Sequence, residues 1–387
     1  MIIPANQRLV AALLLFASLP LFSQEEENLD DLFSDPVADT VVVETPTDHL
    51  AQYVTSDTVV ISGSFTGTGG ILAGWTQWPD VANPRTGFDG TIGLTASATL
   101  NIDARPDPDF RLFGTMTTSM NPLSGQYTWT AFSLGELFVD YTLLGNVFFR
   151  MGNFAIAWGQ GRLFTNTSVI MADVASGFAL RANLPTLLDG VSLIGLMKAG
   201  YFETPLMASY KEIGYAAKVD KILWGTLLSF GARYQVDEGL NALVSVKKVV
   251  AGVDLLADFT MHGAGEIRTY QALAGFYKEW TDFTLYGEYS YAGSIEDAVD
   301  QSVGLAFGIN NIFDTPIDLG FQWLHAFIDG SGTLTGGITW SPWSHITVEI
   351  GVPVVYGDDS SRYVAANADP AGRRIALALG LELSASF

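Results

Sequence analysis

Many segments of this 387-residue chain alternate apolar and polar residues, and the charged side chains within these segments occupy the polar positions. Between Val253 and Met261, for example, Asp254 and Asp258 occupy polar positions between apolar ones. A period of two predicts a β-strand with two unlike faces. Because an unpaired charge is costly in a dry core, the polar faces are expected to line a wet interior. The acidic members are Glu136, Asp140, Asp254, Asp258, Glu288, Asp318, Glu349 and Glu382, and the basic ones are Arg150, Lys218, Arg233 and Lys247.

Few residues have the chemistry of catalysis or metal binding. The four histidines, at positions 49, 262, 325 and 345, are scattered along the sequence. The chain has no cysteine, which excludes disulfides and thiolate metal ligands. The patterns GxSxG and HExxH, the P-loop and the EF-hand are absent. We therefore expect no catalytic residue, no metal ion and no cofactor.

One long stretch lacks clear alternation, from Trp158 to Ala175, with the sequence WGQGRLFTNTSVIMADVA. Its glycines permit a sharp bend, because a residue without a Cβ atom reaches backbone conformations that others avoid. If the bend turns inward, Arg162 reaches the interior, with Asp173 as its counter-charge. The alternative is a surface loop with no role in the interior.

Alternating segments recur from about residue 57 to the end of the chain. Each has roughly the 9 to 11 residues that a tilted membrane-spanning strand needs. About eighteen strands are expected, with sixteen as the alternative, because barrels of this kind have an even number. The expected strands are 57–70, 87–104, 109–120, 131–143, 146–157, 176–184, 189–202, 209–222, 225–237, 239–247, 250–262, 266–280, 282–293, 301–312, 316–328, 332–341, 344–356 and 371–387.

The connections between the segments favour one topology. Their tight turns alternate with long connections, as in transmembrane β-barrels. The sequence therefore predicts an all-β fold, a transmembrane up-and-down antiparallel β-barrel over residues 57–387. A soluble β-sandwich is the weaker alternative, because its sealed core would not tolerate the charges within the strands. The tight turns are 144–146, 224–225, 280–282 and 340–344, and the long connections lie near 71–86, 121–130, 158–175, 203–208, 294–300 and 357–370.

The amino-terminal part has a different composition. Arg8 precedes an uncharged apolar run from Leu9 to Phe22, which is typical of a signal peptide over residues 1–23. Residues 24–56 are rich in Asp and Glu and are expected to form a disordered acidic periplasmic tether. The whole chain has 41 acidic and 19 basic residues and a net charge of −22. Such a charge argues against a nucleic-acid partner.

The last thirteen residues place an apolar side chain at every odd position from Ile375 to Phe387. This terminal strand resembles the closing strand of bacterial outer-membrane β-barrel porins. In those proteins the terminal aromatic residue is part of the assembly signal. The resemblance implies an outer-membrane location, contact with its lipid, and recognition of the strand, including Phe387, by the barrel-assembly machinery.

A second resemblance to porins lies in the middle of the chain. Arg150-Met151-Gly152 on a strand, followed by Trp158-Gly159-Gln160-Gly161, resembles the "R-x-G … WG-x-G" region of several porin families. Many porins fold the loop after their fifth strand into the lumen. The resemblance implies passive diffusion of small hydrophilic solutes, with loop 158–175 as the constriction.

The strand charges are acidic by two to one, so a preference for cations is expected. A homo-oligomer is left open. The residues expected to line or narrow the pore are Arg150, Arg162, Asp173, Asp140, Asp254, Asp258, Glu288 and Glu349.

Two other functions fit a barrel of this kind. One is a transporter of apolar molecules of the fatty-acid type, whose lumen is plugged by the amino-terminal segment. The other is a surface-binding barrel without a pore, which meets its partners through loops 71–86, 294–300 and 357–370.

Overall fold

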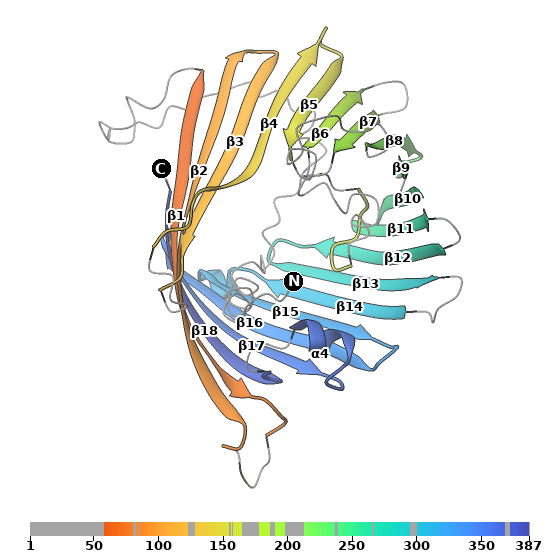
Figure 1. Cartoon of the computed structure of the whole chain (residues 1–387). Coiled ribbons are helices and arrows are strands. Elements are labelled where there is room, and N and C mark those ends of the chain that lie inside the picture. The colour runs from red at the N-terminus through yellow and green to blue at the C-terminus, as the bar shows by residue number, and fades with distance from the viewer. Residues whose placement is uncertain are drawn as a thin grey trace.

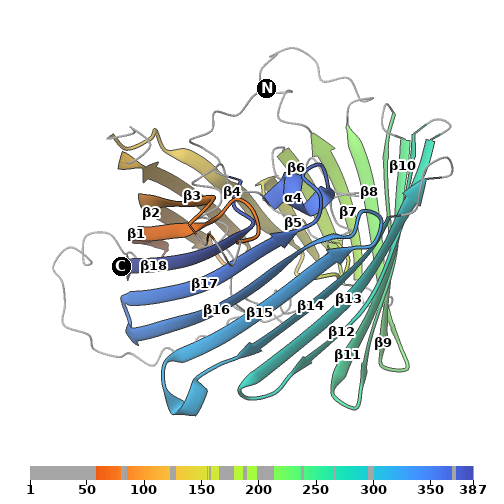
Figure 2. The same ribbon diagram turned by 90° about the horizontal axis from the view of Figure 1, so that it is seen from below.

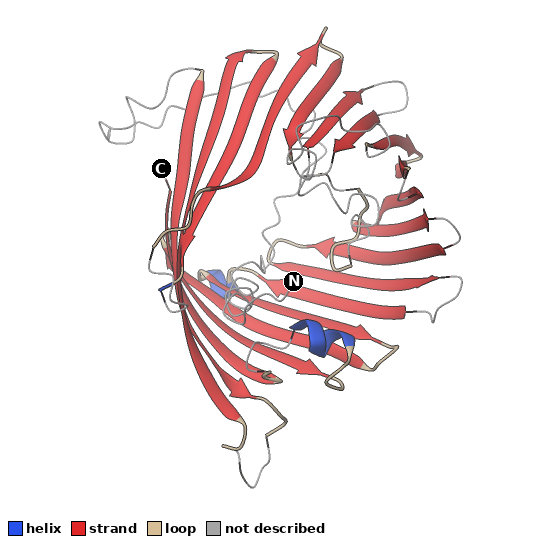
Figure 3. Ribbon diagram, in the orientation of Figure 1, coloured by secondary structure: helices blue, strands red, loops and turns tan. Residues whose placement is uncertain are grey.

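The structure is a computed structural model and consists almost wholly of β-strands (Figure 3). It describes residues 58–79, 83, 85–122, 128–154, 156, 158–164, 178–185, 190–197, 213–236, 239–264, 267–294, 300–367 and 372–386. The strands are β1 (Val59–Trp75), β2 (Phe88–Asp107), β3 (Phe110–Met120), β4 (Ser133–Leu143), β5 (Val147–Asn153), β6 (Phe178–Leu184), β7 (Gly190–Met197), β8 (Gly214–Leu223), β9 (Thr226–Gln235), β10 (Gly239–Val250), β11 (Val253–Ala264), β12 (Ile267–Glu279), β13 (Phe283–Ser294), β14 (Asp300–Ile309), β15 (Ile317–Ala326), β16 (Ser331–Trp343), β17 (Ile346–Tyr356) and β18 (Ile375–Ser386).

The described part of the chain also contains the 3-10 helix η4 (Ile312–Asp314) and the α-helix α4 (Arg362–Asn367). In the described ranges no helix combines the length and the apolar character needed to cross a membrane. The helix α4 lies over β16 and β17 in Figure 1 and contacts both strands.

The eighteen strands form one closed antiparallel sheet. Each strand pairs with the next along the chain, and β18 returns to pair with β1 from Ser64↔Ser386 to Trp75↔Ile375. The tilt of the strands and the curvature of the wall are visible in Figure 2. This confirms the predicted up-and-down barrel and the count of eighteen. Closure satisfies the hydrogen bonds of what would otherwise be two exposed edges.

The predicted period of two separates the outer from the inner face of the wall. On β18, Leu377 and Leu381 are 52% and 44% exposed, whereas Ala376 and Ala378 on either side of Leu377 are buried. The same pattern holds on β11, where Leu255 and Phe259 are exposed on the outside. The outer face is therefore an apolar band, as a barrel in a lipid bilayer requires.

The connections alternate between two rims, as predicted. At one rim most connections are short, for example residues 224–225, 251–252 and 344–345, and the one after β14, residues 310–316, contains η4. The long connections lie at the other rim and include residues 76–87, 121–132 and 357–374. The connections after β9 and β11 at this rim are as short as turns.

The inner face is not covered evenly. On β9 to β14 the inward polar side chains are nearly all buried, including Asp258 at 2% and Glu288 at 3% exposure. On β2 to β5 the side chains of Asp103, Arg111, Asp140 and Arg150 keep between 24% and 30% exposure. Part of the chain inside the barrel therefore packs against the inner face along β9 to β14 and leaves the inner face along β2 to β5 open.

Candidate functional site

The chain leaves the wall of the barrel at the end of β5. The predicted strand 146–157 was too long, because β5 ends at Asn153. At Gly152 the backbone has a φ of 145°, a conformation that favours glycine. Beyond this point Phe154, Ile156 and Trp158 are buried inside the barrel rather than paired in the sheet.

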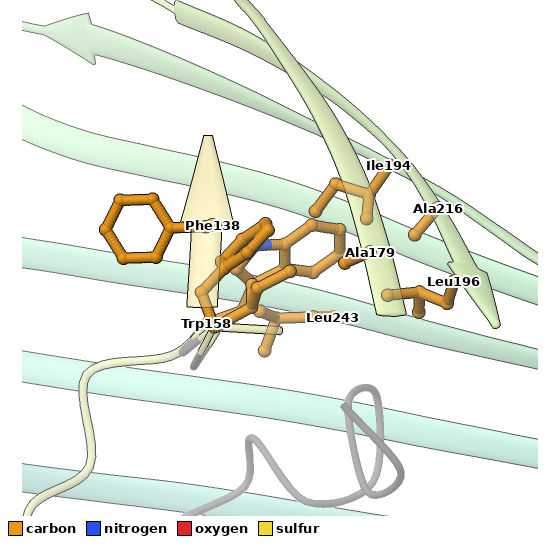
Figure 4. Packing of buried hydrophobic residues seen from close by; sticks show 9 residues of the cluster. Phe138, Trp158, Ala179, Ile194, Leu196, Ala216 and Leu243 are labelled. Atoms are coloured by element: carbon orange, nitrogen blue, oxygen red, sulfur yellow. The ribbon is translucent and has the colours of Figure 1, made fainter. Parts of the chain in front are cut away.

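An apolar cluster anchors this inward segment. Trp158 packs with Phe138 of β4, Ile194 of β7 and Leu243 of β10, and Figure 4 shows its indole in the midst of these side chains. Gly231 of β9 provides the space, since a Cβ atom there would lie 2.9 Å from Cε3 of Trp158. The residues of the apolar cluster come from six strands and from the segment itself.

Two buried carboxylates hold the backbone of the segment beyond Trp158. Oδ2 of Asp258 accepts hydrogen bonds from the N–H groups of Gln160 at 2.6 Å and Gly161 at 3.1 Å. Oε1 of Glu288 accepts from the N–H of Arg162 at 2.6 Å. Oε2 of Glu288 accepts from Leu163 at 2.9 Å and Phe164 at 2.8 Å. The described part of the predicted loop therefore lies in the lumen, bonded to β11 and β13.

The side chain of Arg162 rests against two neighbouring tyrosines of the wall, Tyr277 of β12 and Tyr286 of β13. Its Nη1 donates to the hydroxyl oxygen of Tyr286 at 2.6 Å. Its guanidinium lies 4.0 Å from the ring centroid of Tyr277 and 5.1 Å from that of Tyr286, within the range of cation–π attraction. Asp173, the predicted counter-charge, lies outside the described residues.

A second charged group lies on the open side of the lumen, on β2 to β5. Arg150 binds Asp140 in a bidentate pair, with Nε–Oδ1 at 2.7 Å and Nη2–Oδ2 at 3.1 Å. Arg111 binds Asp103 in the same way, with both distances at 3.0 Å, and lies 3.8 Å from Asp140. The guanidinium of Arg150 also stacks on Phe138 at 4.0 Å. We call these four charged residues the arginine–aspartate group.

The remaining predicted residues are not brought together with the segment. Asp254 forms an ion pair with Lys247 at 3.0 Å near the short-turn rim. Glu349 on β17 faces Gly380 of β18, next to the inward position of Glu382. Phe387 lies outside the described residues.

Sequence reasoning did not single out the residues that receive the segment. These are the two tyrosines and the glycines Gly231 and Gly304. Sequence reasoning also missed Phe154 and Ile156, two apolar residues of the inward stretch itself. A Cβ atom at Gly304 of β14 would lie 2.9 Å from Cδ1 of Leu163 and 3.1 Å from Cε2 of Phe164. Glycine on the polar phase of a strand was the available signal, because it leaves a hollow in the inner face.

Comparisons with solved structures find barrels of the same shape. *Pseudomonas aeruginosa* OccK2 (OpdF) matches with a TM-score of 0.54 at 12% identity, over 84% of this chain and 98% of that one. A BenF-like porin from *Pseudomonas fluorescens* Pf-5 matches with a TM-score of 0.54 at 7% identity, over 84% and 99%. *Pseudomonas aeruginosa* OccD3 (OpdP) matches with a TM-score of 0.53 at 12% identity, over 86% and 94%.

No family model matches the chain, and no curated protein sequence matches it. The similarity to the solved structures extends over nearly the full length of each porin. The chain therefore has the fold of an outer-membrane porin, a closed barrel of eighteen antiparallel strands.

Proposed function

We propose that this protein is an outer-membrane porin through which small hydrophilic solutes diffuse passively. The observation that carries the proposal is the inward segment 158–164, which is fixed to one side of a closed barrel and leaves the charged side chains of the other side partly exposed. A narrowed but open lumen is what a size-selective diffusion pore needs. The constriction is formed by loop 158–175, of which residues 158–164 are described.

The path for solutes runs along β1 to β3 and β16 to β18, away from the inward segment. Inward positions of β1 to β3 carry half-buried hydroxyl and amide side chains, which offer both hydrogen-bond donors and acceptors to a passing solute. The arginine–aspartate group continues this polar surface onto β4 and β5. The hydroxyl and amide residues are Ser62, Ser64, Thr66, Thr68, Thr95, Ser97, Thr99, Asn101, Thr115 and Thr117.

Fewer carboxylates are available to attract cations than the number of acidic residues on the strands suggests. Asp140 and Asp254 are paired with basic residues, and Asp258 and Glu288 are occupied by backbone N–H groups. Glu349 and its neighbour Glu382 differ from these, since in the described part of the chain neither has a basic partner. Two adjacent carboxylates on the lumen wall attract cations from the salt solution.

The outer-membrane location is supported by the apolar band on the outer face and by the porin fold. The strand β18 closes the barrel against β1, which is the position from which a terminal assembly signal would act. Recognition by the barrel-assembly machinery, contact with outer-membrane lipid and a homo-oligomeric state belong to the same proposal.

The experiment is single-channel recording in planar lipid bilayers with the purified full-length protein. Large, stable conductance steps are expected, with a reversal potential across a salt gradient that indicates cation preference. Replacing both Glu349 and Glu382 with Gln should move the reversal potential toward zero. The absence of steps in the intact protein would contradict an open pore. Steps that arise only after deletion of residues 24–56 would instead support a plugged transporter.

A further inference from the structure

Five consecutive backbone N–H groups, from Gln160 to Phe164, all donate to the same two carboxylates. These carboxylates come from β11 and β13, roughly 100 residues or more further along the chain. Both side chains are almost fully buried, Asp258 at 2% and Glu288 at 3% exposure.

The segment needs these acceptors because it runs through the interior without a strand partner. A buried N–H group that lacks an acceptor destabilises the fold, and a carboxylate makes shorter, stronger hydrogen bonds than a neutral acceptor. A single carboxylate has enough lone pairs to accept several N–H groups at once. Two carboxylates can therefore satisfy a whole irregular turn.

We propose that Asp258 and Glu288 are positioning residues that hold the constriction in the lumen, rather than charges that select ions. The proposal deepens the proposed function and rests on it, since a constriction has meaning only in a pore. It also explains why two carboxylates on the polar phase of strands are removed from contact with solvent.

The two carboxylates accept their hydrogen bonds differently. Both oxygens of Glu288 receive backbone N–H groups, so an amide at this position would turn its own NH₂ group toward another N–H. Only Oδ2 of Asp258 receives backbone N–H groups, whereas Oδ1 accepts from the hydroxyl of Ser245 at 2.5 Å. An amide at 258 can keep the N–H groups on its oxygen and donate its NH₂ to the Ser245 hydroxyl oxygen.

Because of this difference, two variants can distinguish a positioning role of the carboxylates from a role of their charge in ion selection. The variants Glu288→Gln and Asp258→Asn remove the same charge from the same region. If the charges select ions, the two variants should shift the reversal potential to a similar extent and leave the segment in place. If the carboxylates position the segment, Glu288→Gln should release it, and Asp258→Asn should disturb it much less.

Amide hydrogen exchange of the full-length protein in detergent measures the release directly. The N–H groups of residues 160–164 should be protected in the wild type. In Glu288→Gln those of residues 162–164 should exchange about 10- to 100-fold faster, which corresponds to the loss of one charge-assisted hydrogen bond. Asp258→Asn should give a clearly smaller acceleration. Equal effects of the two variants, or unprotected amides in the wild type, would overturn the proposal.

A matched control is Asp318→Asn on β15. Asp318 accepts a hydrogen bond from the N–H of Asn311 at 2.8 Å, and among the described residues no hydrogen bond or ion pair joins it to residues 158–164. Its substitution removes one strand carboxylate but should leave exchange at 160–164 unchanged.

A second variant tests the packing of the segment against the wall and leaves both carboxylates unchanged. Gly304→Ala adds a Cβ atom against Leu163, Phe164 and Leu324 at 2.9 to 3.1 Å, so it should also accelerate exchange at 162–164. In planar bilayers both Glu288→Gln and Gly304→Ala should raise the unitary conductance. If the wild type forms no channels, the proposed function fails, while the exchange experiment still decides whether the carboxylates hold the segment.

Discussion

Charged side chains of the barrel interior have three different roles, and residue type alone does not separate them. Asp258 and Glu288 accept backbone N–H groups, Asp140 and Arg150 neutralise each other, and Glu349 faces the lumen beside another carboxylate. An acidic residue that points into the barrel therefore contributes to the proposed ion selectivity only when its carboxylate is not already bound by N–H groups or by a basic side chain. The lumen is less negative than the strand composition suggests.

The pair of Asp140 and Arg150 gives a prediction about both stability and selectivity. Asp140→Asn leaves the guanidinium of Arg150 without a carboxylate partner in the described part of the chain. Because both side chains are 27% exposed, water screens the pair, and the loss of stability should be only about 1 kcal/mol. The lumen gains one net positive charge, so the reversal potential should shift toward anion preference.

Single-channel recordings in a salt gradient and thermal unfolding in detergent test this expectation. Asp254→Asn is a suitable comparison, because Asp254 is likewise paired, with Lys247 at 3.0 Å. A shift toward cations in Asp140→Asn, or no shift at all, would contradict the assignment of the arginine–aspartate group to the solute path.

At the level of elements, the helix α4 is held at the rim by hydrogen bonds to Asp329 and an ion pair of Arg362, contacts that we together call the clasp. Oδ2 of Asp329 accepts from the N–H of Arg362 at 2.6 Å, and Oδ1 accepts from the hydroxyl of Ser331 at 2.7 Å. The side chain of Arg362 forms an ion pair with Asp300 of β14. Tyr363 and Val364 of α4 are buried, so the clasp fixes the last long connection against the barrel.

The clasp should weaken in acid. The hydrogen bonds from the Ser331 hydroxyl and from the Arg362 N–H lower the pKa of Asp329 below its ordinary value of 3.8. A group whose pKa is lowered by its contacts stabilises them fully above its ordinary pKa, and the stabilisation is lost as the pH falls through the lowered value. The helix should therefore stay in place at neutral pH and loosen below about pH 3.8.

A nitroxide label can follow this change, since the chain has no native cysteine to compete for it. A single cysteine replaces Ala366, which is exposed on α4, and the mobility of the label is measured between pH 6 and pH 3. The same label in Asp329→Asn should be mobile already at neutral pH and respond less to acid. A label whose mobility is constant with pH in the otherwise unchanged protein would contradict the role of Asp329.

At the scale of the whole molecule, stability depends on keeping the two faces of the wall distinct. Leu381 lies on the outer face near the middle of β18, and Ser384 lies on the inner face three residues later. A lysine on the lipid face near the bilayer midplane costs about 2 to 4 kcal/mol, whereas the inner face is wet. Leu381→Lys should therefore destabilise the barrel far more than Ser384→Lys.

Urea unfolding in lipid vesicles, followed by the gel mobility of folded and unfolded barrel, measures this difference. Equal stability of Leu381→Lys and Ser384→Lys would mean that the outer face of β18 is not in contact with lipid. A selective loss in Leu381→Lys would support the position of the membrane on the barrel.

Local patterns in the sequence are enough to predict the wall of the barrel. Period-two alternation is a local property of each strand, so it predicted the eighteen strands, their antiparallel order and the face on which each side chain lies. The misplaced end of β5 has a local cause too, because Gly152 takes a conformation that the alternation of its neighbours does not reveal.

The segment inside the barrel, in contrast, depends on contacts that form only in the folded chain. The bonds from Gln160 to Asp258 and from Arg162 to Glu288 join residues 98 and 126 positions apart. No local pattern encodes such distances, because the partners meet only after the sheet has closed into a ring. The sequence marked Arg162, Asp258 and Glu288 as residues of the interior, and closure of the barrel made the two carboxylates the supports of one inward segment.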